Sequence, residues 1–146
     1  QNCDESYAIT IMRRMMYRIA QRICEKQNCL AIVNGESIGQ VASQTLESMQ
    51  TINEVTQMPV IRPVACLDKL EIIDLAKKIN TYETSILPFE DCCTIFTPKN
   101  PVTKPTLHRA QRLESRFDFE TLLSECIEKT ESINIYPSVK MDEDIF

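Results

Sequence analysis

Glycine is scarce in this chain of 146 residues, which has only two glycines, one histidine and no tryptophan. No apolar run approaches the roughly 18 residues that a membrane helix needs, and no signal peptide opens the sequence. The hydrophobic content of 43% and the charged content of 25% are ordinary for a globular chain. We therefore predict a soluble, cytoplasmic protein without a membrane partner. Because Gln1 leads almost directly into a helical pattern, we expect the chain to be part of a longer protein.

Cysteine pairs with the spacing of a metal site are also missing, although the chain has seven cysteines. None has the C-x-x-C spacing that is typical of zinc sites, so we predict no metal site. An odd number of cysteines in a long, core-rich chain does not indicate a disulfide framework, and we expect free thiols in a reducing compartment. The single histidine, His108, has no serine nucleophile motif to work with, which argues against a catalytic triad.

Positive charge is scarce overall but concentrated in one segment. The net charge of −5 argues on average against a nucleic-acid partner. Residues 99–116, however, carry five basic side chains and one acidic one, whereas residues 117–146 carry eight acids and two lysines. Local patches, rather than net charge, decide contacts with phosphate. The sequence leaves open whether the basic segment binds phosphate or is only a solvated helix face.

Hydrophobic periodicity predicts helices that alternate with short strands. The first helix carries Arg14, Arg18 and Arg22 on a face away from its apolar residues. Asp68 with Glu71 forms a capping box, and the segment 80–105 reads as irregular. The predicted helices cover 6–27, 38–56, 68–79, 106–116 and 119–130, and the predicted buried strands cover 29–33 and 60–67. This alternation indicates an α/β fold with a parallel sheet, in which ligands bind beyond the carboxyl ends of the strands.

Both glycines lie directly after the first predicted strand, in the stretch VNGESIGQVASQ. At Gly35 and Gly39, the missing Cβ allows a positive φ or leaves space for a ligand. Ser37 and Gln40 have capping-box spacing, so we expect a helix to begin here, with free N–H groups that favour an anion. A strand, a glycine and a capped helix outline a nucleotide site, although many such turns carry a glycine for steric reasons alone.

Polar side chains continue along the second predicted helix. Gln40, Ser43, Gln44 and Glu47 have the spacing of one helix face. Such a stripe could form hydrogen bonds to a base or ribose, or it could be the solvated side of the helix.

Two adjacent cysteines, Cys92 and Cys93, lie in the irregular segment PFEDCCTIFTPKNPVTKP. An exposed loop thiolate can act as a nucleophile, and nearby lysines would lower its pKa, whereas the preceding acids would raise it. The residues alone leave open whether these thiols react or are bystanders.

Several motifs in order closely resemble one enzyme family. They are NGESIGQVASQTLESM, INEV, PVIRPV, DKLEIIDLAKKINTYETSILPFEDCC and FTPKNPVTKP. From about Arg13 to Ile135, the chain resembles the tRNA 4-thiouridine synthetases, or tRNA sulfurtransferases, which also serve thiamine biosynthesis. The resemblance implies a Rossmann-like adenine-nucleotide α-hydrolase fold, also called a PP-loop ATP pyrophosphatase domain, here truncated on its N-terminal side.

The resemblance also implies a reaction and its partners. ATP, with Mg²⁺, would adenylate a carbonyl oxygen of uridine 8 in tRNA, and a persulfide from a cysteine desulfurase or another donor would displace AMP. Homodimers are expected in the family. Carried over by motif, Arg13, Gly35 and Gln44 would contact ATP, and Cys92 would act as partner to the sulfur-carrying cysteine. Gly39 would let the start of the helix pack closely.

One family motif is absent from this sequence: the phosphate-gripping loop, serine-glycine-glycine followed by aspartate and serine. We therefore predict that residues 1–136 are the C-terminal portion of the pyrophosphatase domain, that 137–146 form a flexible acidic tail, and that the chain alone does not turn over. Two alternatives are another PP-loop adenylating enzyme and a non-catalytic RNA-binding or oligomerisation module.

Overall fold

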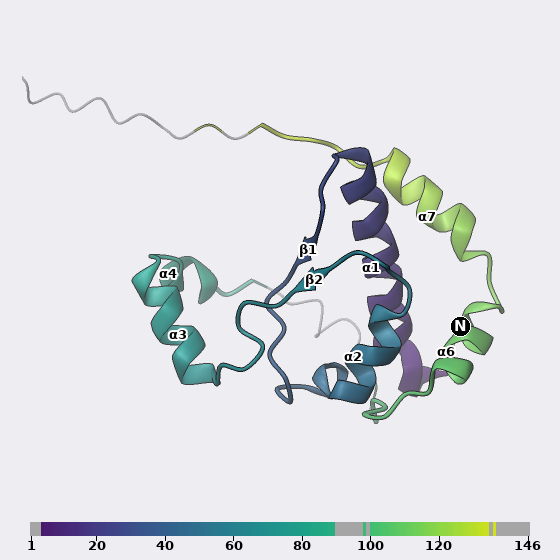
Figure 1. The fold of residues 1–146 in the computed structure, drawn as a ribbon, viewed down its shortest axis with the longest axis horizontal. Helices are drawn as coiled ribbons and strands as arrows, with labels where there is room; N and C mark the ends of the chain where they lie inside the picture. The colour runs from purple at the N-terminus through teal and green to yellow at the C-terminus, as the bar shows by residue number, and fades with distance from the viewer. Residues whose placement is uncertain (1–3, 90–97, 99, 135, 137–146) are drawn as a thin grey trace, which may run out of the picture.

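The chain is built around one long helix. The computed structural model describes residues 4–89, 98, 100–134 and 136 (Figure 1). A short 3-10 turn, η1 (Glu5–Tyr7), is capped by the Asp4 side chain and leads into α1 (Ala8–Lys26). This confirms the helix predicted over 6–27. In Figure 1, α1 lies between the strands on one side and the helices α6 and α7 on the other.

The sheet has two parallel strands, β1 (Ile32–Val33) and β2 (Val60–Ile61). Ile32 pairs with Val60, and Val33 pairs with Ile61. The parallel pairing confirms the predicted α/β class. Both strands are shorter than predicted, and the expectation that the first is buried on both faces is wrong, because Leu30 is 87% exposed and Val33 is 63% exposed. The helix α1 packs against β1. Burial of a strand on both faces needs a second covering layer, which the described residues do not provide over Leu30 and Val33.

The connection between the strands is not the single helix predicted over 38–56. Gly39 has φ +80°, which interrupts the helix. A 3-10 turn, η2 (Ala42–Gln44), and the shorter helix α2 (Leu46–Asn53) follow. The predicted cap at Ser37 is therefore wrong. Its hydroxyl donates to the Leu67 carbonyl at 2.8 Å, whereas Thr45 caps α2 by accepting from the Ser48 N–H at 3.1 Å.

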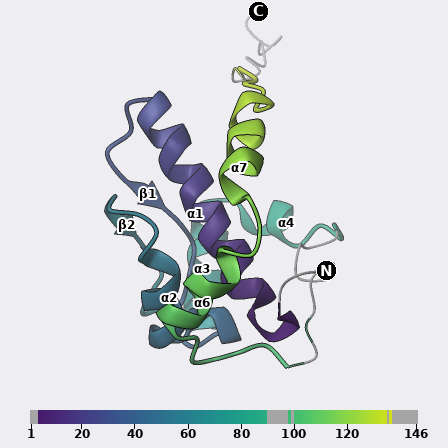
Figure 2. The same cartoon turned by 90° about the vertical axis from the view of Figure 1, so that its right-hand side faces the viewer.

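The C-terminal half follows the predicted pattern more closely. The helix α3 (Lys69–Lys78) begins with the predicted capping box of Asp68 and Glu71. A short helix, α4 (Tyr82–Ser85), lies inside the segment that we expected to be irregular. The helices α6 (Leu107–Glu114) and α7 (Phe119–Glu128) pack against α1, as Figure 2 shows from the side, and Asp118 caps α7 as predicted.

The core between α1 and α6 is small and contains a buried ion cluster. Its buried apolar residues are Tyr7, Ile11, Ala110 and Leu113. The expectation that Arg14 belongs to a polar outer face is wrong, because this side chain is 1% exposed. The Arg14 guanidinium donates to Glu114 at 2.7 Å and also to the Thr51 carbonyl, while Arg18 donates to the same Glu114 carboxylate at 2.7 Å. This cluster joins α1, α2 and α6.

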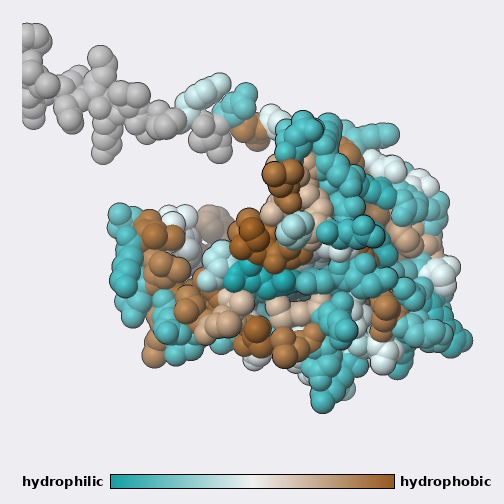
Figure 3. Space-filling view, viewed as in Figure 1, coloured by the Kyte–Doolittle hydropathy of each residue, from teal (hydrophilic) through white to brown (hydrophobic). Residues whose placement is uncertain are grey.

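The surface near the strands is apolar. Figure 3 shows hydrophobic side chains gathered in the middle of this face, and Leu30, Val33 and Ile61 are among the large exposed apolar residues. In the part of the chain that the structure describes, no helix is both long and apolar enough to cross a bilayer.

Candidate functional site

Both strands end at the same edge of the sheet and lead into hydrogen-bonded loops. The Asn34 N–H donates to the Ile61 carbonyl at 3.1 Å, and the Ile38 N–H donates to the Ala65 carbonyl at 2.9 Å. The loop after β1 therefore lies beside the loop after β2. This carboxyl edge is where parallel α/β sheets bind ligands.

A buried carboxylate, Glu36, organises this edge. Its side chain is 5% exposed. One carboxylate oxygen accepts from the Arg62 Nε at 2.7 Å, the Tyr17 hydroxyl at 3.0 Å and the Asn34 amide at 2.9 Å. The other accepts from the guanidinium of Arg13. Glu36 thus ties α1 to the loops that leave both strands.

The charges around Glu36 fix its ionisation. Burial raises the pKa of Glu36, but the hydrogen bond from Arg62 and the charge of Arg13 outweigh it, and the pKa lies below the usual 4.5. Burial, followed by the negative charge of Glu36, raises the pKa of Tyr17 above its usual value. Glu36 is therefore an anion at neutral pH, and Tyr17 is a neutral hydrogen-bond donor.

The three residues predicted to contact a nucleotide lie around this cluster. Arg13 reaches Glu36, which follows Gly35 in the sequence, and its Nη1 lies 3.5 Å from the Ser43 hydroxyl, beside Gln44. The fold therefore brings Arg13, Gly35 and Gln44 to one place, although they come from α1, the loop after β1 and η2. Their contact with a nucleotide stays a prediction.

The two glycines have different surroundings from those expected. A Cβ built at either position would meet no atom within 4 Å among the described residues. Close packing at Gly39 is therefore the wrong reason for that glycine, and its φ of +80° is the physical one. Gly35 has neither a positive φ nor a crowded neighbour, so the backbone beside it is open to an approaching molecule.

Two buried polar atoms at this edge have no partner among the described residues: the Nε of Arg13 and the Oε1 of Gln44. One is a donor and the other an acceptor, which fits a polar ligand with both functions. The predicted helical stripe that includes Gln44 is not present, because residues 40–47 run through a turn, η2 and the start of α2. Gln44 lies in η2 instead, next to Ser43, whose hydroxyl is 3.5 Å from the Arg13 Nη1.

Sequence reasoning missed the residues that hold the site together, above all Glu36, Tyr17 and Arg62. A signal was available for Glu36, which comes three residues after the first predicted strand, where parallel sheets bind ligands. Arg62 fell inside the second predicted strand and Tyr17 inside the first predicted helix, so no comparable signal marked them. The predicted reactive cysteine, Cys92, and its neighbour Cys93 lie outside the described residues. So does the predicted tail, 137–146.

Comparisons with known proteins identify the family of this chain. A family model described as "Thiamine biosynthesis protein (ThiI)" matches residues 1–119. The chain belongs to the ThiI family. Across 137 residues it is 58% identical to a probable tRNA sulfurtransferase of Halothermothrix orenii, a match that covers 92% of this chain and 35% of that relative.

A solved structure agrees with the ThiI assignment. A crystal structure of a 4-thiouridine synthetase–RNA complex with bound ATP matches with a TM-score of 0.83 and 43% sequence identity. The match covers 88% of this chain and 34% of that one. The chain thus spans about a third of the length of these two proteins. The predicted family and α/β fold are confirmed.

The buried carboxylates predict how stability depends on pH. The pKa of Glu36 and that of Glu114 both lie below the usual 4.5, because arginine partners outweigh burial. Both groups therefore stabilise the fold fully above pH 4.5, and this stabilisation is lost as the pH falls through their folded pKa values. In urea unfolding between pH 7 and pH 3, we expect the free energy of unfolding to decrease once the pH is lower than about 4.5. A Glu114→Gln variant should show a shallower fall, and an equal slope would contradict this assignment.

Proposed function

We propose that this chain is part of an ATP-dependent tRNA sulfurtransferase that converts uridine 8 of tRNA to 4-thiouridine. Its similarity to a probable tRNA sulfurtransferase and to a 4-thiouridine synthetase solved with RNA and ATP supports the proposal. The structural observation that carries it is the meeting of Arg13, Gly35 and Gln44 at the carboxyl edge of the sheet, with two unpaired buried polar atoms.

The reaction needs two displacements. The uridine carbonyl oxygen attacks the α-phosphorus of ATP, and pyrophosphate leaves. A persulfide sulfur then attacks the activated ring carbon, and the carbon–oxygen bond breaks to release AMP. The ring carbon is then joined through two sulfurs to the sulfur-carrying cysteine. The thiolate of Cys92 attacks the sulfur of that cysteine and forms a disulfide with it, while the original sulfur–sulfur bond breaks and its electron pair leaves with the ring-bound sulfur, which becomes the thiocarbonyl.

In this proposal the chain's own residues hold the nucleotide. Gly35 leaves the backbone after β1 accessible, the Arg13 Nε donates a hydrogen bond and the Gln44 Oε1 accepts one. The Nη2 of Arg13 remains on Glu36, so this arginine is held in place before ATP arrives. Mg²⁺ would accompany the ATP phosphates, whose gripping loop has no counterpart in this sequence.

The remaining partners follow from the same assignment. Sulfur would come from a cysteine desulfurase or another persulfide donor. The protein would work in the cytoplasm, paired with a second copy as its family is expected to be. The name of the matching family model, thiamine biosynthesis protein, supports an additional role in making the thiazole of thiamine.

Measuring 4-thiouridine in tRNA tests the proposal in the full-length protein that carries this chain. We expect activity in the wild type, a roughly tenfold higher ATP requirement for Gln44→Ala, equivalent to about 1.4 kcal/mol of lost binding, and no turnover for Cys92→Ser. Cys93→Ser is the matched control and should stay active. Absence of thiouridine with the wild type would overturn the assigned activity, and an active Cys92→Ser would overturn only the role of Cys92.

A further inference from the structure

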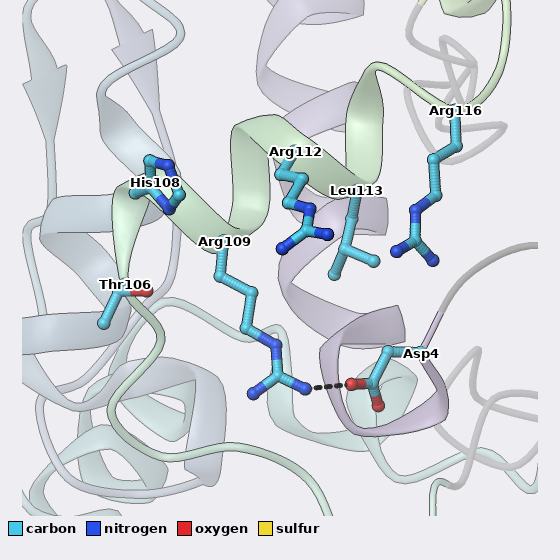
Figure 4. A pocket seen from close by; sticks show the side chains of 7 residues that line it. All are labelled: Asp4, Thr106, His108, Arg109, Arg112, Leu113 and Arg116. Carbon is cyan, nitrogen blue, oxygen red and sulfur yellow. Dashed lines mark hydrogen bonds and ion pairs between the residues drawn. The ribbon is translucent and has the colours of Figure 1, made fainter.

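A cavity of about 520 Å³ lies along α6, away from the strand ends. It is lined by His108, Arg109, Arg112 and Arg116, with Asp4 opposite them. Figure 4 shows the guanidinium groups of Arg112 and Arg116 directed into the same space as the ion pair between Arg109 and Asp4. We call these three arginines the α6 arginine cluster.

The α6 arginine cluster has more positive charge than its surroundings neutralise. Arg109 pairs with Asp4, and its guanidinium lies 4.8 Å from the centre of the Tyr7 ring. Among the described residues, Arg112 and Arg116 have no carboxylate within salt-bridge distance. The nearest acid in sequence, Glu114, is buried and already holds Arg14 and Arg18. Two exposed cations therefore face one cavity without an internal partner.

The helix under the cluster is anchored in the core. Ala110 and Leu113 are buried in the core between α1 and α6, and Glu114 joins the buried ion cluster. Arg109 and Arg112 are three residues apart on α6, so they lie on one side of the helix. The helix C-terminus near Arg112 would favour a cation even without a ligand, but this does not account for a cavity that also gathers Arg109 and Arg116.

We propose that the α6 arginine cluster binds the phosphodiester backbone of the RNA substrate, an inference that rests on the proposed function. Its lining has three arginines against one carboxylate, and the imidazole of His108 is the one aromatic ring in it, which suits phosphates better than stacked bases. ATP also carries phosphates, but its predicted contacts lie at the strand ends, and α1 stands between the strands and α6 (Figure 1). Arg112 and Arg116 hold phosphate oxygens, and the paired Arg109 orients the backbone beside them.

The test is tRNA binding by the full-length protein with Arg112→Gln and Arg116→Gln combined. Losing two phosphate contacts should weaken binding roughly 20- to 60-fold near 0.1 M salt and reduce the slope of log K against log salt by about 1.4–1.8. The matched control is Lys26→Gln with Lys129→Gln, which removes the same charge from exposed positions at the ends of α1 and α7. This lysine variant should change the tRNA affinity and the salt slope by only a small fraction of the change in the arginine variant. ATP affinity, measured in parallel, should be equal in all three proteins.

Each outcome decides between the hypotheses. Equal effects in the arginine and lysine variants would show nonspecific attraction and overturn the site. Reduced ATP affinity with unchanged tRNA binding would make the occupant a nucleotide, which also overturns it. If the arginine variant binds tRNA normally and still makes 4-thiouridine, the cluster is not an RNA-binding site, and the proposed function is unaffected. A wild type that makes no 4-thiouridine and does not bind tRNA would remove both.

Discussion

Replacing Glu114 with alanine should lower the free energy of unfolding by about 3–5 kcal/mol, the cost of leaving a buried charge without its partner. Glu114 accepts from Arg14 at 2.7 Å and from Arg18 at 2.7 Å, and the side chain of Arg14 is 1% exposed. Without the carboxylate, the acceptors left to Arg14 among the described residues are the Thr51 carbonyl and the half-exposed Glu54. Urea unfolding at neutral pH, followed by circular dichroism, measures the change.

The chain offers a matched control for this substitution. Glu120 also pairs with an arginine of α1, Arg22, but its side chain is 62% exposed. Glu120→Ala should therefore cost about 0–1 kcal/mol, because solvent already screens the pair. A comparable loss of stability in both variants would show that burial of the Arg14–Glu114 pair does not set its contribution.

This pair shows where sequence reasoning stops. The first helix follows from local periodicity, and the capped starts of α3 and α7 follow from side chains that bond within three residues. The partner of Arg14 is 100 residues away in the sequence, so no local pattern links the two. By spacing alone Arg14 belongs with Arg18 and Arg22 on a polar face, and only the packing of α6 against α1 places it inside.

The candidate site was predictable to a similar depth. The parallel strands and the glycine after the first one indicated a ligand edge, and the resemblance to the family supplied Arg13, Gly35 and Gln44. The sequence could not show that the predicted helix is interrupted, because the same residues fit a helical period, whereas the backbone leaves the helical region at Gly39, Val41 and Thr45. Nor could it show that Arg13 is bound to Glu36, since that contact depends on how α1 crosses the strand ends.

Changing Glu36 to glutamine should reduce kcat/KM for ATP in 4-thiouridine formation by about 100-fold, the scale of loss for a misplaced binding group. Every hydrogen bond of the Glu36 carboxylate is an accepted one, from Arg13 on one oxygen and from Arg62, Tyr17 and Asn34 on the other. A glutamine replaces one acceptor with an NH₂ donor. Whichever way the amide turns, it points a donor at donors, and the edge around Gly35 must rearrange.

The matched control is Glu47→Gln, the same chemical change close by on α2, where the side chain is 50% exposed and its partner Lys104 lies 3.5 Å away. This variant should keep its kcat/KM for ATP. The KM for tRNA should be unchanged in both variants, because the α6 arginine cluster lies away from this edge. If Glu36→Gln only destabilised the protein, kcat/KM would fall for ATP and for tRNA alike. Activity is measured at a temperature below the thermal unfolding midpoint of the Glu36→Gln variant. Full activity in that variant would mean that the buried carboxylate supports the fold but does not position Arg13 for ATP.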